Sequence, residues 1–241
     1  MNIIQCPHCM GEIDLQQVPL EEIAQSNAMI IRKSEDRSSW QEIADIIHSG
    51  RATMLFNVGD SVQCELKDGT RVVIDVAGIN TYNDNEVIFC FRDVYWEHYM
   101  NPRNTNSGGY AKSEMAEYLD NDIFTLLPDD LQLAIKPRNI RQNIKGTLYE
   151  RECKLWLPSI YEIAGEQHKE YGSDIDDKHL ELFQNKRNRI KYDRNNVRHY
   201  WWERSPNISY SAYFMNFHHY GHAYSSNYAS YTNGVVPCFS I

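Results

Sequence analysis

Several features that would place a protein in a class at once are missing from this chain of 241 residues. No run approaches the roughly 18 consecutive apolar residues that a membrane-spanning helix needs, so no membrane span is expected. The N-terminus lacks a basic stretch followed by an apolar one, which predicts synthesis in the cytoplasm without a signal peptide. No internal repeat is visible, so a solenoid or propeller is not expected.

Positive charge is also scarce. The chain has 24 Lys and Arg residues against 33 Asp and Glu residues, a formal net charge of −9. Proteins that bind nucleic acid by neutralising phosphates need a basic excess, so a nucleic-acid partner is not expected. Its six cysteines are scattered along a long chain, which is typical of reduced thiols rather than of a disulfide framework.

The sequence motifs of common catalytic sites are absent as well. We find no Ser-His-Asp order, no glycine-rich phosphate loop and no His-Glu-x-x-His. Cys238 lies in an apolar segment and Cys153 has no histidine partner within sequence reach, so neither is predicted to be a reactive nucleophile. The chain is therefore expected to be no enzyme and to use no cofactor.

One absence is confined to the C-terminus. From Ser205 to Ile241 there is no Asp, Glu, Lys or Arg, yet the segment is not apolar. Between Asn207 and Asn233 there are six Tyr, five Ser, four Asn and three His among 27 residues. Large apolar residues interrupt this stretch, and the chain closes on an apolar segment from Val235. That pattern predicts a folded scaffold carrying a polar surface, with the last segment as a buried strand, rather than disorder.

The composition of this tail favours binding. Tyrosine offers a large rigid contact with few torsions to freeze, while Ser and Asn offer adaptable hydrogen bonds, as in antibody paratopes. A second indication comes from the genetic code. Replacing one or both adenines of the Asn codon AAY by any base yields every residue type found from 207 to 233 except Met215. A tail rich in Tyr and Ser for an unrelated reason remains the alternative.

Two domains are expected, an N-terminal appendage over residues 1–37 and a larger domain over 38–241. Cys6-Pro7-His8-Cys9 is a C-x-x-C turn that supplies half of a zinc site, but no second pair follows nearby. An unmetallated turn or a site shared with another chain is the alternative. A helix is expected over about 19–33.

The larger domain is predicted to be α+β, because the hydrophobic period changes along it. We expect a helix over 38–50, a hairpin over 59–77 with Asp68-Gly69 at its tip, and a strand over 86–91. Further helices are expected over 112–119 and 128–135, and a short strand at 156–159 leads into another. The charged stretch 176–192 is predicted to lie on the surface.

The end of the chain resembles the C-terminal signature of the variable proteins of diversity-generating retroelements, which have a C-type-lectin-like fold and occur in phages and bacteria. The resemblance covers about residues 38–241. It rests on Trp201-Trp202-Glu203-Arg204-Ser205-Pro206, Phe214, Gly221 and Gly234-Val235-Val236-Pro237-Cys238-Phe239, preceded by Gly59-Asp60, Leu66-Lys67-Asp68-Gly69, Met100-Asn101, Gly108-Gly109-Tyr110, Ser113-Glu114-Met115, Tyr118-Leu119, Leu127-Pro128, Leu157-Pro158-Ser159 and Glu162-Ile163.

In that family, error-prone copying at adenines diversifies exposed positions while fixed positions keep the core. The resemblance implies a receptor or adhesin for a protein or glycan ligand, carried on a virion or a cell, with a homo-oligomer as an option. It implies fixed positions at Trp201, Trp202, Arg204, Phe214, Phe217, Gly221, Gly234 and the closing strand. The ligand-binding positions would be Asn207, Ser209, Tyr210, Ser211, Tyr213, Asn216, His218, His219, Tyr220, His222, Tyr224, Ser225, Ser226, Asn227, Tyr228, Ser230 and Tyr231.

Some features depart from the family pattern or allow other interpretations. Glu203 stands where an apolar residue is usual, and Val236 where Arg is common. His218, His219 and His222 have a spacing that metals use, but the segment is not predicted to be helical and has no carboxylate. The Trp201-Trp202 pair is expected to pack below the tail, with a carbohydrate platform as the alternative. An undiversified structural module, with the tail as an oligomer interface, is the alternative function.

Overall fold

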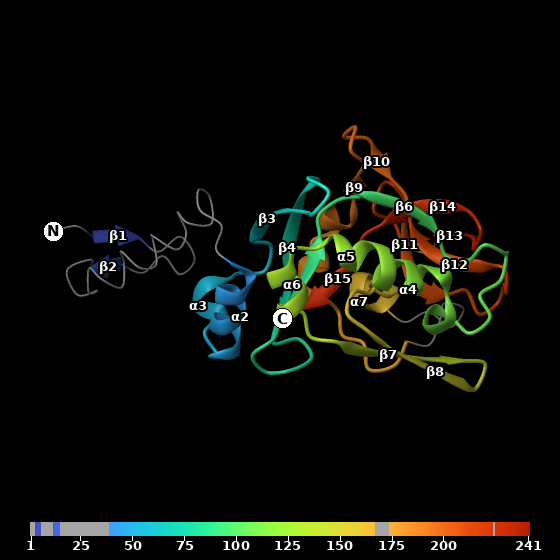
Figure 1. Ribbon diagram of the computed structural model, residues 1–241, viewed down its shortest axis with the longest axis horizontal. Helices are drawn as coiled ribbons and strands as arrows, with labels where there is room; N and C mark the ends of the chain where they lie inside the picture. Colours follow the sequence, from blue (N-terminus) through green and yellow to red (C-terminus); the bar gives the residue numbers. More distant parts are fainter. Residues whose placement is uncertain (1–2, 6–11, 15–38, 167–173, 224) are drawn as a thin grey trace. The chain divides into compact units, whose positions relative to one another are not determined.

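A computed structural model describes residues 3–5, 12–14, 39–166, 174–223 and 225–241. The chain divides into two units, Met1–Ser39 and Trp40–Ile241. In the first unit, strands β1 (Ile3–Gln5) and β2 (Glu12–Asp14) pair antiparallel (Figure 1). The expected Cys6–Cys9 turn and the helix over 19–33 lie outside the described residues.

The second unit is built on a four-stranded sheet of order β15-β5-β4-β3. Strands β3 (Ser61–Glu65) and β4 (Arg71–Ile79) form the expected hairpin, whose turn uses Gly69 at φ +82°. Strand β5 (Val87–Phe91) is buried at every position, as its continuous apolar sequence predicts. The last strand, β15 (Cys238–Ser240), pairs with β5, so the end of the chain is part of the core.

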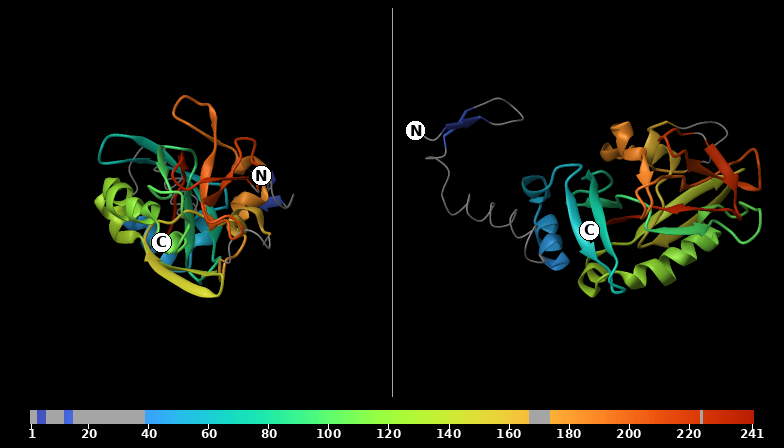
Figure 2. Two further views of the ribbon diagram at one scale, coloured as in Figure 1. Left: turned by 90° about the vertical axis from the view of Figure 1, so that its right-hand side faces the viewer. Right: turned by 90° about the horizontal axis from the view of Figure 1, so that it is seen from above.

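Helices precede and flank this sheet. Helix α2 (Trp40–His48) buries the apolar face predicted for it and is followed by α3 (Ala52–Leu55). A helical stretch runs along the unit through η1 (Tyr110–Lys112), α4 (Glu114–Tyr118), the π-helical turn η2 (Leu119–Ile123) and α5 (Phe124–Leu126) (Figure 2). Helices α6 (Asp129–Ala134) and α7 (Ile160–Ala164) follow, and Ser159 and Glu162 form a capping box at the start of α7.

The tail forms most of a second, five-stranded sheet of order β13-β12-β11-β14-β6. Strand β6 (Trp96–Tyr99) is one edge, and β13 (Ser225–Tyr228) is the other. Strands β11 (Trp201–Pro206) and β12 (Tyr213–Phe217) pair antiparallel, while β11 and β14 (Thr232–Val235) pair in parallel. The combination of helices with these mainly antiparallel sheets makes the domain α+β, as predicted.

Two hairpins and two short helices complete the unit. Strands β7 (Arg138–Ile144) and β8 (Thr147–Cys153) form one hairpin, and β9 (Lys191–Tyr192) and β10 (Arg198–His199) form the other. The 3-10 helices η3 (Glu181–Gln184) and η4 (Lys186–Arg189) lie between them in sequence. The expected surface location of 176–192 is wrong in part: Leu182 and Phe183 are buried because they pack into the core, although several neighbours are exposed.

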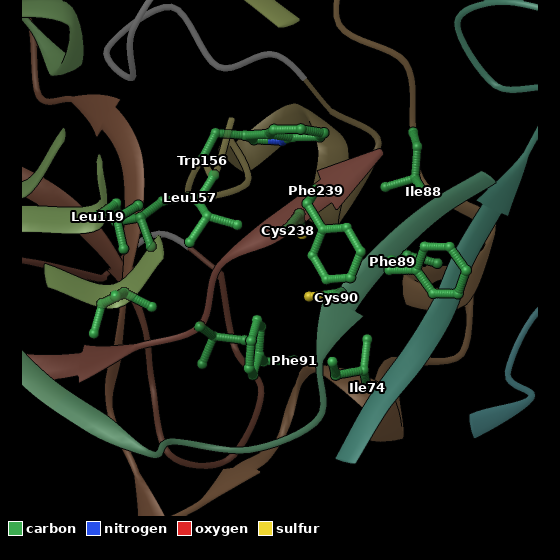
Figure 3. Packing of buried hydrophobic residues seen from close by; sticks show 14 of the residues in the cluster. Ile74, Ile88, Phe89, Cys90, Phe91, Leu119, Trp156, Leu157, Cys238 and Phe239 are labelled. Carbon is green, nitrogen blue, oxygen red and sulfur yellow. The ribbon is translucent and has the colours of Figure 1, made fainter. Parts of the chain in front are cut away.

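The core gathers side chains from segments that are far apart in the sequence. Phe89 and Phe239 stack with ring centres 5.3 Å apart (Figure 3). Trp40 meets both rings edge-on. Residue Trp156, expected in a short strand, instead makes a single bridge to Cys238. No helix among the described residues is long and apolar enough to cross a membrane.

Candidate ligand-binding surface

Within the described part of the tail, the side chains form a buried set and an exposed set. The scaffold positions Trp201, Trp202, Arg204, Phe214 and Phe217 are almost completely buried. Burial of both tryptophans excludes the carbohydrate platform, since a platform must expose its ring faces. The binding candidates that are exposed or half-exposed are Ser209, Tyr210, Ser211, Tyr213, His218, His219, Tyr220, His222, Ser225, Ser226, Asn227, Tyr228, Ser230 and Tyr231.

Two predicted contact residues are in fact buried, and Tyr224 lies outside the described residues. Asn216 is 2% exposed because it lies in the interior of β12, opposite Trp202. Asn207 is 4% exposed, and its Oδ1 accepts hydrogen bonds from the backbone N–H groups of Ser209 and Tyr210, each at 3.0 Å. Both therefore belong to the scaffold: replacing Asn207 would leave two backbone N–H groups without their acceptor, and Asn216 is enclosed within the sheet.

Four tyrosines form a continuous aromatic cluster at one end of β12. This tyrosine cluster consists of Tyr210, Tyr213, Tyr228 and Tyr231. Tyr213 lies on β12 and Tyr228 on β13, while Tyr210 lies in the turn before β12 and Tyr231 in the turn after β13. The ring centres of Tyr213 and Tyr228 are 4.5 Å apart, and those of Tyr228 and Tyr231 are 5.3 Å apart. Tyr210 is 64% exposed and Tyr231 is 52% exposed, so the cluster presents aromatic area to solvent.

The other end of β12 carries a second group, here called the histidine turn (residues 218–222). The rings of His218 and His219 stack at 4.0 Å, and Tyr200 meets both edge-on. The pKa of His218 is lowered by partial burial and by His219 and His222, so this ring is neutral at pH 7. In the part of the chain that the structure describes, no group of three or more His, Cys, Asp or Glu is placed to hold a metal.

The turn that carries Tyr210 is held by one upstream side chain. The buried Asn106 amide donates to the carbonyl oxygens of Asn207 at 2.7 Å, Tyr210 at 3.2 Å and Tyr213 at 2.8 Å. The Asn106 backbone N–H donates to the carbonyl of Ser211 at 2.7 Å. All four contacts go to the tail's backbone, so they do not depend on which side chains stand at 209–213.

The same upstream loop also supports the turn between β13 and β14. The backbone N–H of Asn101 donates to the carbonyl of Ala229 at 2.9 Å, and Asn104 Oδ1 accepts from the Ser230 hydroxyl at 2.6 Å. The side chain of Asn101 keeps the loop itself in shape by donating to the carbonyl of Thr105 at 2.7 Å. Both turns of the tyrosine cluster therefore rest on residues 101–106.

Beneath the tail lies a buried ionic cluster that sequence reasoning missed. Arg204 on β11 contacts Glu162, Asp177 and, at 3.0 Å from its Nε, Asp174. Arg138 joins Glu162 and Asp177 from β7. Its members are separated by up to 66 positions in the sequence, and the one local signal is Arg204 two positions after the Trp201-Trp202 pair in a strand that pairs within the sheet. It anchors the first strand of the tail to α7 and to the segment after residue 173.

The five charges of this cluster do not balance. Arg204 and Arg138 outweigh the effect of burial on Glu162 and lower the pKa of its carboxyl to about 2. Burial, assisted by Glu162 and Asp174, raises the pKa of Asp177 to about 7 even though Arg204 opposes the shift. Two guanidinium groups thus face three carboxyl groups, and a proton held on Asp177 makes the cluster neutral.

Glu203, next to Arg204 on β11, is a buried acid outside the ionic cluster. It is fully buried, and within the described structure neither of its carboxylate oxygens has a hydrogen-bond partner. Burial, with a smaller effect of Asp174, raises the pKa of this carboxyl well above its ordinary value, so the side chain is a neutral acid at pH 7. This is the position at which the resemblance leads us to expect an apolar residue.

The buried cysteines offer no activated thiol. Burial raises the pKa of Cys153 to about 12 and that of Cys238 well above its ordinary value. Cys90 faces Cys238 across the β5–β15 pair, and both thiols are inaccessible. The thiols of Cys153 and Cys238 are protonated at neutral pH and are therefore poor nucleophiles.

Comparison with known proteins places the chain in a family but attaches no activity to it. The family model "Domain of unknown function (DUF6273)" matches residues 85–241, more than half of the chain, so the protein belongs to this family. No curated protein and no solved structure matches the chain. The match begins at the end of the β4–β5 connection and includes the whole tail.

Proposed function

We propose that this member of the DUF6273 family is a non-enzymatic binding protein whose C-terminal surface is diversified, like the variable proteins of diversity-generating retroelements. One observation carries the proposal: the exposed tail side chains are uncharged and largely aromatic, while the bonds from Asn106 that hold their turn go to backbone atoms. Side chains on such a turn can be exchanged without breaking the contacts that position it.

The proposed fold is C-type-lectin-like. It is supported by the way the last strand, β15, returns to the core beside β5 while the preceding strands form a separate sheet. In this arrangement the tyrosine cluster is the main contact site. Exposed tyrosines of this kind are typical binding hot spots, each contributing about 1–3 kcal/mol on truncation. The proposed ligand is a macromolecule, a protein or a glycan.

The proposal can be tested on the protein itself. Replacing Tyr210, Tyr213, Tyr228 and Tyr231 together by Ser should change the free energy of unfolding little, because exposed substitutions usually cost about 0.5 kcal/mol or less each. The matched control, Phe214→Ala in the same strand as Tyr213, should cost about 3–5 kcal/mol because Phe214 is fully buried. Urea unfolding measures both. A loss of several kcal/mol in the tyrosine variant would show that the cluster is structural.

Binding and diversification need their own measurements. A display library randomised at Ser209, Tyr210, Ser211, Tyr228 and Tyr231 in the full chain should yield folded members that bind an unrelated globular protein chosen as target. In the DNA, we expect a near-identical copy of the tail's coding region, with mismatches only at adenines of that copy, beside a reverse-transcriptase gene. Mismatches at other bases, or no copy, would favour an undiversified module that uses the tail as an oligomer interface.

A further inference from the structure

The cations of this acidic chain are concentrated beside the histidine turn. Six of the 24 Lys and Arg residues lie between positions 186 and 198, against a single acid, Asp193. Arg189 and Lys191 are internal, since they donate to the carbonyl oxygens of Phe183 and Arg92. The remaining four, Lys186, Arg187, Arg194 and Arg198, are exposed. We call these four residues the cationic rim.

The fold brings the rim and the histidine turn together. A Cβ added to Gly221 would lie 3.1 Å from Ile190 and 3.3 Å from the carbonyl oxygen of Lys186, so the turn packs directly on η4. From the other side, the guanidinium of Arg198 lies 5.4 Å from the ring centre of Tyr220. Rim residues therefore border the turn from η4 and from the β9–β10 hairpin.

The positive charge of the rim is not neutralised by an ion pair within the described structure. Among the described residues, no carboxylate lies within ion-pair distance of any of its four side chains. The nearby acids are otherwise engaged: Asp193 accepts from the backbone of Asn195 and Val197, and Glu97 pairs with His199. The backbone N–H of Thr70 chiefly lowers the pKa of Asp68, and the charge of Arg194 adds a smaller effect in the same direction. Exposed cations on η4 and on the β9–β10 hairpin of a protein of net charge −9 mark a surface suited to an acidic partner.

We propose that the cationic rim and the histidine turn form a second binding site, at the opposite end of β12 from the tyrosine cluster, for a carboxylate-rich segment of a partner protein. The five residues of β12 separate the two sites by about 15 Å. An extended polyanion such as nucleic acid would be repelled by the rest of this acidic surface, whereas a short acidic segment contacts the rim alone. Tyr220, 55% exposed and uncharged, supplies apolar area beside the cations.

This inference rests on the proposed function only for the three histidines, because the rim lies outside the diversified segment.

The test uses the full chain and fluorescence anisotropy with three probes: a polyglutamate peptide, heparin and a single-stranded oligonucleotide. The variant Arg194→Glu/Arg198→Glu is compared with Arg51→Glu/Lys145→Glu, which changes the net charge equally at exposed positions in the α2–α3 connection and the β7–β8 turn.

We expect the rim variant to bind polyglutamate at least about tenfold more weakly than the wild type, and the control to stay within about twofold. Equal losses in both variants, or no binding by the wild type, would overturn the proposal. Tighter rim-dependent binding of heparin or the oligonucleotide would overturn the assignment to a carboxylate-rich partner. The variant with Ser at all four positions of the tyrosine cluster should bind polyglutamate as the wild type does. The result with polyglutamate therefore does not depend on whether the tyrosine cluster binds a ligand.

Discussion

At the scale of single residues, the most informative side chains are charged groups that the fold buries. Arg204 has carboxylate partners on two sides and donates to the carbonyl of Leu157 at 2.9 Å, whereas its neighbour Glu203 has no partner among the described residues. Removing the charged side chain is therefore expected to destabilise the protein at Arg204 and to stabilise it at Glu203. Breaking a buried pair leaves an uncompensated charge, while removing an unpaired acid removes a desolvation penalty.

Replacing Glu203 by Leu should therefore stabilise the protein. We expect the free energy of unfolding at pH 7 to rise by about 1–3 kcal/mol, because the buried acid loses hydration on folding and gains no hydrogen bond. The control, Glu162→Leu, should lower it by about 3–5 kcal/mol, since it removes a buried carboxylate that contacts both Arg204 and Arg138 and accepts from the Ser159 N–H. Urea denaturation of both variants checks this. A destabilised Glu203→Leu protein would mean that the carboxyl has a partner.

The ionic cluster also predicts a pH dependence of stability. Folded Asp177 keeps its proton up to a pH of about 7, while an unfolded Asp loses it near pH 4. The native state therefore binds more protons across this window, and the free energy of unfolding falls as the pH rises from about 4 to about 7. The slope from this group is at most about 1.4 kcal/mol per pH unit.

Replacing Asp177 by Asn isolates that contribution, because Asn has the same shape and cannot titrate. Unfolding of the two proteins by urea at several pH values should show a flatter profile for Asp177→Asn, with the difference between the proteins closing toward low pH. Identical slopes would mean that Asp177 is ionised throughout and that another carboxyl carries the proton.

At the scale of elements, the tail combines strands that hold the core with turns that display side chains. From Phe214 to Phe217, β12 is buried on both of its faces, so exposure is confined to its ends and to β13. Each turn is tied to something outside the tail: the first to Asn106, and the histidine turn to η4. Local order in these turns therefore comes largely from the scaffold, with a contribution within the histidine turn from His218, whose Nδ1 accepts from the Tyr220 N–H at 3.3 Å.

Asn106→Ala should loosen the first turn while leaving the core intact. We expect a loss of about 1–3 kcal/mol in the free energy of unfolding, because three carbonyl oxygens each lose one hydrogen bond, although those of Tyr210 and Tyr213 keep a second donor. Amide exchange at 209–213 should accelerate, and the near-ultraviolet circular dichroism of the tyrosine cluster should weaken. Asn104→Ala, on the same loop, is the control and should leave residues 209–213 unchanged. Unchanged exchange in Asn106→Ala would refute the bracing role.

At the scale of the whole molecule, the family match and the folding unit have different limits. The match begins at residue 85, but β5 pairs with β4, which pairs with β3, and all three belong to the sheet that receives β15. Trp40 on α2 packs against Phe89 and Phe239 of the same core. A chain that starts at residue 85 would lose one side of its core and expose the edge of β5.

Truncation tests this directly. A protein containing residues 40–241 should fold cooperatively, with a melting temperature close to that of the full chain, because it retains the whole second unit. One containing 85–241 should be insoluble or lack a cooperative transition. Thermal unfolding followed by circular dichroism distinguishes the two. A cooperative transition in the shorter protein would show that β3, β4 and α2 are dispensable.

Much of the fold follows from local sequence. The amphipathic period over Trp40–His48, the Asp68-Gly69 turn and the apolar run of β5 each predict an element that the structure contains. Their signals are local because hydrophobic period and turn chemistry depend on neighbours in the chain. The hairpin β7–β8 was not predicted, since its strands are polar and only partly buried and so lack a clear period.

For the candidate site, too, some properties follow from the local sequence and others only from the tertiary structure. An uncharged, tyrosine-rich tail is a property of composition, and its exposed character could be predicted without coordinates. Only the tertiary structure separated Asn207 and Asn216 from the exposed residues, and only it joined Asn106, the ionic cluster and the cationic rim to the tail. Those contacts join residues that are distant in sequence, and no local pattern encodes them. The chain alone specifies which chemistry is available; packing decides which side chains reach solvent and what holds them there.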